Sequence, residues 1–320
     1  MTSTSRTVLV GTSLTDASDE VVGNGLQIAR AAGAKLHLVH AFDLTMLYCG
    51  SAFGGGAYVP AMIEDARAAC RRRMEAQAAR LGVQPAELAG LTALDGAPFG
   101  VLIETAQALA ADLIVLGAAD ADRWTETLLG STADRVIRAA GCPVLATRGR
   151  LPVPPRRALI AVDLSPASAE AMACGLGVLD AMGAGPAARP GAAVEVLYVS
   201  GNGLFEDTQP LPDPPDGRRP AQENLRRFLS SHGLDPVWRL RPRVRRGPSA
   251  AGEILDHCNT ASPDLIVVGT HGRGGVPRLL LGSVAESVLR HARQSVLAVP
   301  PQAARASRRA AILAQGLEGA

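Results

Sequence analysis

The sequence has few aromatic residues and no paired cysteines. Phe, Trp and Tyr make up 3% of the 320 residues, so we expect hydrophobic cores built from Ala, Val, Leu and Ile. The five cysteines are scattered and include no Cys-x-x-Cys pair. This pattern provides no metal site and is typical of the reducing cytoplasm. We therefore predict a cytoplasmic protein without a bound structural metal.

Long apolar runs and a strong charge of either sign are also lacking. No apolar run reaches the roughly 20 residues that span a membrane. The formal net charge of +2 gives no support for a dedicated nucleic-acid-binding protein. The first six residues lead directly into a predicted strand and have none of the features of a signal peptide. We expect neither a nucleic acid nor a membrane as a partner.

Several common catalytic motifs are missing as well. The sequence contains no Gly-x-x-x-x-Gly-Lys-Ser/Thr phosphate loop and no Gly-x-Ser-x-Gly nucleophile elbow. No lysine–acid–metal set for phosphoryl transfer is evident either. We therefore expect no enzymatic activity and assign no catalytic residue.

What the sequence does contain is an internal repeat. Residues 8–18 align without gaps with residues 158–168, and residues 112–117 align with residues 264–269. Such self-similarity indicates two tandem copies of one domain. We predict the following boundaries: a first domain at 1–149, a proline-containing linker at 150–157, a second domain at 158–301 and a tail at 302–320.

Each copy alternates strand and helix patterns. In the first copy, strands are predicted at 7–12, 35–41, 91–94, 112–117 and 143–147, and helices at 16–32, 60–81, 98–110 and from 131. Strands separated by helices predict a parallel sheet with helices on both faces. The expected fold class is therefore α/β, with two tandem open parallel sheets.

The glycine-rich stretch Gly269–Ser283 is the main candidate site. It follows an apolar strand and leads into a helix that begins near Gly282. Backbone N–H groups and the positive end of the helix dipole then point at one place, which suits a phosphate. Gly272 allows close backbone approach, and Arg273 can contact phosphate oxygens.

Asp163 completes the candidate site. It ends the first strand of the second copy, and ligands of open parallel sheets bind beyond such strand ends. Its carboxylate can accept hydrogen bonds from ribose hydroxyls. The alternative interpretation is structural: Gly282 ends a loop, and Ser283 and Glu286 form a capping box that satisfies the helix start.

The first copy differs at the positions that matter. Ser13 stands where the second copy has Asp163, and Asp120 stands in place of Gly272. A carboxylate beside the phosphate position would repel a polyphosphate. The glycines at the strand end and the helix start, Gly117 and Gly130, are retained together with Ser131. We expect this second site to bind nucleotide weakly or not at all.

An arginine stripe occupies residues 239–245, with arginine at every second position. In a strand these side chains share one face, and Pro242 places the strand at a sheet edge. The stripe is either a solvated edge protected by charge or a docking face for an acidic partner.

These residues together resemble the universal stress protein family in its tandem two-domain form. Its ATP-binding members carry the spacing G-2x-G-9x-G-[S/T], which Gly269, Gly272, Gly282 and Ser283 match. The resemblance implies Rossmann-like sheets of five strands in the order 3-2-1-4-5, of the adenine nucleotide alpha hydrolase-like type. It also implies a homodimer.

The resemblance further implies ATP, alone or with Mg²⁺, as the ligand. The residues expected to hold this adenine nucleotide are Ala161, Val162, Asp163, Val199, Gly269, Gly272, Arg273, Gly282, Ser283 and Val284. The expected function is nucleotide-responsive regulation in the stress response, through assembly or partner binding. The alternatives are a slow ATPase or phosphotransferase, and an interaction module with vestigial sites.

Overall fold

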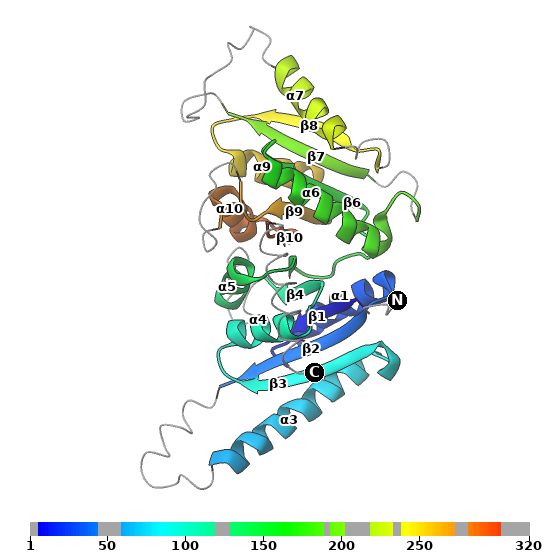
Figure 1. Ribbon diagram of the computed structural model, residues 1–320, viewed down its shortest axis with the longest axis vertical. Coiled ribbons are helices and arrows are strands. Elements are labelled where there is room, and N and C mark those ends of the chain that lie inside the picture. The colour runs from blue at the N-terminus through cyan, green and yellow to red at the C-terminus, as the bar shows by residue number, and fades with distance from the viewer. Residues whose placement is uncertain are drawn as a thin grey trace, which may run out of the picture. The chain divides into compact units, whose positions relative to one another are not determined.

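The computed structural model describes residues 6–43, 59–118, 129–188, 193–201, 218–232, 238–272 and 281–301 (Figure 1). The chain divides into two compact units, one formed mainly by residues up to Arg150 and the other mainly by residues from Leu151 onward.

The first unit alternates strands and helices. Its elements are β1 (Thr7–Gly11), α1 (Ala17–Ala32), β2 (Lys35–Phe42), α3 (Val59–Arg80), a short 3-10 helix (Pro85–Glu87), β3 (Leu88–Asp95), α4 (Pro98–Ala108), β4 (Leu113–Gly117), α5 (Ser131–Ala139) and β5 (Val144–Thr147). The third strand is longer than its weak apolar pattern predicted. Neighbouring strands of this sheet run parallel to each other, in the order β3-β2-β1-β4-β5.

The second unit repeats this plan. Its elements are β6 (Arg157–Val162), α6 (Pro166–Leu179), a π-helical turn (Asp180–Ala184), β7 (Ala193–Ser200), α7 (Arg218–Ser231), β8 (Arg241–Arg246), α9 (Ala250–Ala261), β9 (Leu265–Gly269), α10 (Ser283–His291) and β10 (Ser295–Val299). The parallel strands have the order β8-β7-β6-β9-β10. The predicted fold class and the order 3-2-1-4-5 are thus confirmed.

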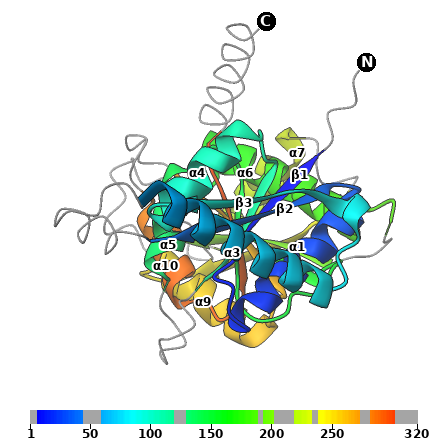
Figure 2. The ribbon, with the colours of Figure 1, turned by 90° about the horizontal axis from the view of Figure 1, so that it is seen from below.

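Helices cover both faces of each sheet. A connection between two parallel strands is almost always right-handed. Helices in connections that lead toward opposite edges of the sheet therefore lie on opposite faces. In the first unit α1 and α3 cover one face, while α4 and α5 pack against each other on the other face. Figures 1 and 2 both show α3 alongside β3. In the second unit α6 and α7 form one layer, and α9 and α10 form the other.

The central strands, such as β4 and β9, are apolar because both of their faces are covered. The side chains of Leu9, Ile114, Leu145 and Leu159 are almost completely buried. Phe228 is the one aromatic side chain in the core of the described residues. Aliphatic packing therefore builds the cores, as the composition predicted. Among the described residues, no helix is long and apolar enough to cross a membrane.

Two glycines let the first helix of each unit lie close to its sheet. A Cβ atom on Gly25 of α1 would lie 2.3 Å from Val10 Cγ2, and one on Gly175 of α6 would lie 2.5 Å from Val267 Cγ1. The two glycines occupy equivalent positions of the repeat. The same close helix–strand contact is therefore present in both copies.

The arginine stripe lies at the edge of the second sheet, as Pro242 predicted. Strand β8 begins at Arg241, so Arg239 lies outside it, with a left-handed φ of 49°. Arg243 forms an ion pair with Glu195 at 3.4 Å, and Arg245 pairs with Glu253 at 2.7 Å. Two stripe arginines are thus neutralised inside their own domain. This favours the charge-protected edge over a docking face.

The glycine contact in α6 leads to a stability prediction. Gly175→Ala should lower the free energy of unfolding of the second domain by about 1–3 kcal/mol, because the added methyl overlaps Val267. Gly177→Ala, in the same helix, should raise it by about 0.5–1 kcal/mol, because nothing lies within 4 Å of the added carbon. Urea unfolding followed by Trp238 fluorescence in a Trp124→Phe background measures both changes. Equal stability of the two variants would contradict the close contact.

The edge of the second sheet leads to a pH prediction. His257 Nε2 lies 2.9 Å from Glu195 Oε2. Burial alone would raise the pKa of Glu195, but the hydrogen bond from His257 and the charges of His257 and Arg243 lower this pKa overall. A carboxyl group with a lowered folded-state pKa stabilises the fold above its unfolded pKa. This contribution is lost as the pH falls through the folded pKa.

Glu195→Gln should therefore lose less stability than the wild type between about pH 5 and pH 3. The exposed Glu223 on α7 provides a control, since Glu223→Gln should keep the wild-type pH dependence. Thermal unfolding across this pH range measures the difference. Parallel curves for Glu195→Gln and the wild type would rule out this contribution.

Candidate functional site

Asp163 and Gly272 meet at the carboxyl edge of the second sheet. Strands β6 and β9 are neighbours, with Ile160 paired to Val267. Asp163 follows β6 directly, and a Cβ atom on Gly272 would lie 2.8 Å from Asp163 Oδ2. The structure therefore places the carboxylate against the glycine loop, and any side chain at Gly272 would displace it.

The Asp163 side chain also holds the turn that follows it. Its Oδ1 accepts a hydrogen bond from the Ser165 backbone N–H at 2.9 Å. Ser165 then caps α6 by accepting a bond from Ser168 N at 3.1 Å. Between them Leu164 has a φ of 64°, which is uncommon for a residue other than glycine. Asp163 thus has one oxygen in the turn and the other beside Gly272.

Thr270 connects the two ends of the glycine loop. Its side chain is 2% exposed. Its N–H donates to Val299 O at 2.9 Å, and its carbonyl accepts from Gly282 N at 2.9 Å. The helix start is thereby fixed beside the strand end. Sequence reasoning did not select Thr270, although a polar residue directly after a buried strand was the available signal.

His271 brings a neutral ring to the same loop. Its Nδ1 lies 2.9 Å from Thr270 Oγ1, and burial lowers the pKa of His271 below its usual value. The Nε2 atom is buried and has no hydrogen-bond partner among the described residues. Buried polar atoms are normally paired, so Nε2 is available to a ligand or a water molecule.

The start of α10 differs from the structural alternative. Gly282 is the N-cap, and no side-chain hydrogen bond caps this end, so the predicted capping box of Ser283 and Glu286 is wrong. The helix begins one residue earlier, because Gly282 O accepts the bond from Glu286 N at 2.8 Å. Glu286 instead pairs with Arg290 at 3.1 Å. The first-turn N–H groups of a helix have no acceptor within it. Among the described residues, no side chain caps them.

The other residues predicted to contact the nucleotide lie in β6, in β7 and in the first turn of α10. Ala161 and Val162 lie in β6, paired with Leu197 and Tyr198. Val199 lies inside β7 rather than after it, opposite Arg245 and one residue beyond the last pairing with β6. Val284, in the first turn of α10, is 37% exposed.

Two further residues, Gly269 and Arg273, were also predicted to contact the nucleotide. A Cβ atom on Gly269 would lie 3.0 Å from Ala171 Cβ, so packing of α6 on β9 already requires a small residue there. Arg273 lies outside the described residues. Among the residues that the structure describes, no group of three or more His, Cys, Asp or Glu could hold a metal ion.

The first domain keeps the backbone arrangement without the acid. Gly130 N donates to Ala118 O at 2.7 Å, which repeats the bond between Gly282 and Thr270. Helix α5 starts at Ser131, after the β4 end at Gly117. At the end of β1, Ser13 Oγ bonds Thr15 Oγ1 at 2.8 Å. The substituted Asp120 lies outside the described residues.

Comparison with known proteins identifies the family. The model of the universal stress protein family matches residues 4–148 and 155–300. A universal stress protein of Mycobacterium tuberculosis is 30% identical over 192 residues, which cover 58% of this chain and 61% of that relative. The chain therefore spans less than two thirds of the length of this curated relative.

Solved structures share the fold at lower identity. A universal stress protein structure from Pseudomonas aeruginosa has a TM-score of 0.64 at 19% identity and covers 96% of this chain and 97% of its own. One from Archaeoglobus fulgidus has a TM-score of 0.62 at 21% identity, with 94% and 99% covered. The chain belongs to the universal stress protein family and carries two tandem copies of its domain.

Proposed function

We propose that the second domain binds ATP, alone or with Mg²⁺, and that the nucleotide regulates assembly or partner binding. The observation that carries the proposal is the meeting of Asp163 with Gly272 beside the start of α10. A carboxylate, a backbone without a side chain and a helix N-terminus lie at one sheet edge. These are the groups that ribose and phosphates require.

The residues present fit this ligand. The missing Cβ of Gly272 leaves room for the Asp163 carboxylate beside the loop. The first-turn N–H groups of Ser283 and Val284 can donate to phosphate oxygens, and Arg273 adds a positive charge. Asp163 Oδ2 can accept from ribose hydroxyls. The unpaired His271 Nε2 provides one further polar contact.

The proposal is for binding rather than turnover. The lowered pKa of His271 keeps its ring neutral near pH 7, so this residue adds no charge that would stabilise a transferring phosphoryl group. The first domain shares the helix start but has Ser13 in place of the acid, so we propose that one domain of the two binds tightly. Homodimer formation and a cytoplasmic location stay predictions.

A matched pair of glycine variants tests the phosphate position. Gly282→Val should weaken ATP binding at least about tenfold, because a side chain at the start of α10 obstructs the approach of phosphate to the backbone. Gly130→Val makes the same change at the equivalent position of the first domain, where φ is −64° compared with −59° at Gly282. It should leave ATP affinity unchanged. Isothermal titration of both variants measures the contrast.

A second pair tests the role of the carboxylate. Asp163→Asn keeps an oxygen for Ser165 N but loses the charge, and it should weaken ATP and AMP binding by similar factors of about ten. Asp264→Asn provides the control, since Asp264 binds the backbone N–H groups of Arg156 and Arg157 at the opposite end of the sheet. It should lower stability without changing nucleotide affinity.

Three outcomes would count against the proposal. No heat with ATP or AMP from the intact protein would favour an interaction module with vestigial sites. Equal weakening by Gly282→Val and Gly130→Val would place the nucleotide elsewhere. Phosphate release at metabolic rates, abolished by Gly272→Asp, would favour an ATPase.

A further inference from the structure

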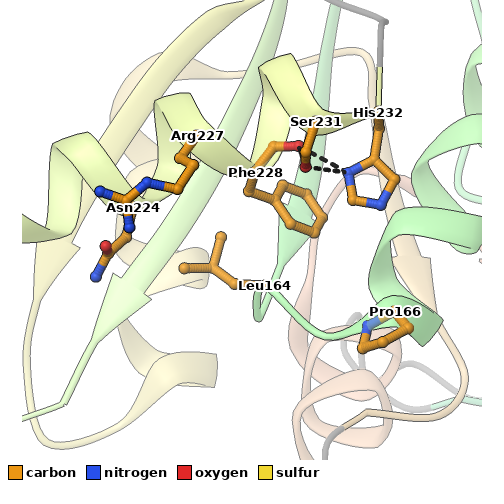
Figure 3. A pocket seen from close by; sticks show the side chains of 7 residues that line it. All are labelled: Leu164, Pro166, Asn224, Arg227, Phe228, Ser231 and His232. Carbon is orange, nitrogen blue, oxygen red and sulfur yellow. Dashed lines mark hydrogen bonds between the residues drawn. The ribbon is translucent and has the colours of Figure 1, made fainter.

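The second domain contains an open pocket of about 360 Å³ that the nucleotide site does not use (Figure 3). Leu164 and Pro166 line it from the turn between β6 and α6. The remaining lining side chains belong to α7 and the residue that follows it: Asn224, Arg227, Phe228, Ser231 and His232. Figure 3 shows the Phe228 ring between Leu164 and His232.

The equivalent place in the first domain is closed by hydrogen bonds. Gln77 of α3 is 2% exposed and binds Thr12 Oγ1 at 2.8 Å, Ser18 Oγ at 3.0 Å and Asp19 Oδ1 at 2.7 Å. Arg80 forms a two-pronged ion pair with the Asp19 carboxylate at 2.7–2.8 Å. This polar network fills the space between α3 and the start of α1.

Sequence differences between the copies account for the open pocket. Each residue of α3 aligns with the residue of α7 that lies 151 positions later in the sequence. The strand register supports this offset: Gly90 pairs with His37 in the first domain, and the corresponding Arg241 pairs with Glu195, the equivalent of His37, in the second. The aligned pairs are Arg73 with Asn224, Ala76 with Arg227, Gln77 with Phe228, Arg80 with Ser231 and Leu81 with His232, while Asp19 aligns with Ala169. The three side chains of the polar network, Gln77, Arg80 and Asp19, are thus replaced by Phe228, Ser231 and Ala169.

The same differences change which charges the site contains. Arg73, Arg80 and the acid Asp19 of the first domain are lost, while Arg227 is gained. Among the described residues, no Asp or Glu lines the pocket and Arg227 forms no ion pair. A closed network in which Asp19 neutralises Arg80 has thus become an open pocket with one arginine.

The orientation of His232 defines what it presents to a ligand. Its Nδ1 lies 2.7 Å from Phe228 O, and because a carbonyl can only accept, Nδ1 carries the proton. The Nε2 atom remains for another partner. The centroid of the His232 ring lies 4.9 Å from that of the Phe228 ring at an interplanar angle of 51°, so two tilted rings line this side of the pocket.

We propose that this pocket binds a small organic anion with a flat apolar body. Phe228, Leu164 and Pro166 contact the body of the ligand, and Arg227 binds its anionic group. Asn224 and Ser231 offer neutral hydrogen bonds at the rim. The proposal is independent of ATP binding, because none of these residues is assigned to the nucleotide.

Fluorescence titration of the full chain with anilinonaphthalene sulfonate tests the proposal, since this probe has the required shape and charge. Arg227→Gln and Phe228→Gln should each weaken binding at least about tenfold. Phe228→Gln introduces the residue of the first domain. Arg226→Gln is the matched control, because this neighbouring arginine does not line the pocket. The control should bind as tightly as the wild type.

Two further arms complete the experiment. Phenylnaphthylamine, the uncharged analogue of the probe, should bind the wild type and Arg227→Gln equally, because it lacks the group that Arg227 recognises. Excess ATP should leave probe binding unchanged. Thermal unfolding of each variant shows that it is folded. Equal probe affinity of Arg227→Gln and Arg226→Gln, or displacement of the probe by ATP, would overturn the proposal.

Discussion

All strands of each domain run in one direction, and this constraint determines where its chemistry lies. Parallel pairing brings the carboxyl ends of β6, β7 and β9 to one edge of the second sheet. The helices that return the chain cover both faces, so the central strands must be apolar. Polar groups are therefore concentrated in the turns at the strand ends. Asp163 and Gly272, far apart in sequence, meet for this reason.

The two copies show which residues the fold itself requires. Both keep the close glycine contact of the first helix, at Gly25 and Gly175, and the hydrogen bond that fixes the last helix beside its strand. Side chains on this shared backbone have diverged. His37 bonds Thr92 in the first domain, while the equivalent Glu195 pairs with Arg243 and His257 in the second. Backbone packing constrains the glycines and the residues of the shared hydrogen bond. Side chains such as His37 and Glu195 are not constrained in this way and differ between the copies.

Periodicity and repeat spacing predicted the helices and the strands, and the rule for ligand sites of parallel sheets predicted that Asp163 lies near the glycine loop. The strand order came from the resemblance to the universal stress protein family. The sequence predicted a helix start near Gly282, but it left open a capping box one residue later, since Ser-x-x-Glu fits that motif. It did not show that Arg243 and Arg245 are neutralised, because their partners Glu195 and Glu253 lie on other elements. The pocket beside Phe228 was also missed. An empty space depends on the lengths of side chains from two elements, which no local pattern records.

The two proposed sites of the second domain share a single turn. Asp163 Oδ1 accepts from Ser165 N, and Leu164, between them, is left-handed and lines the pocket. A ligand that moves Leu164 must therefore alter the backbone that orients Asp163. Coupling between two binding sites is reciprocal. An anion that favours one geometry of this turn therefore changes the affinity for nucleotide by the same factor by which bound nucleotide changes the affinity for the anion. A rigid turn that both ligands accept unchanged gives no coupling, however tightly each binds. Independent binding at the two sites therefore requires that the hydrogen bond from Ser165 N to Asp163 hold this turn, with Leu164 left-handed, in one geometry that both ligands accept.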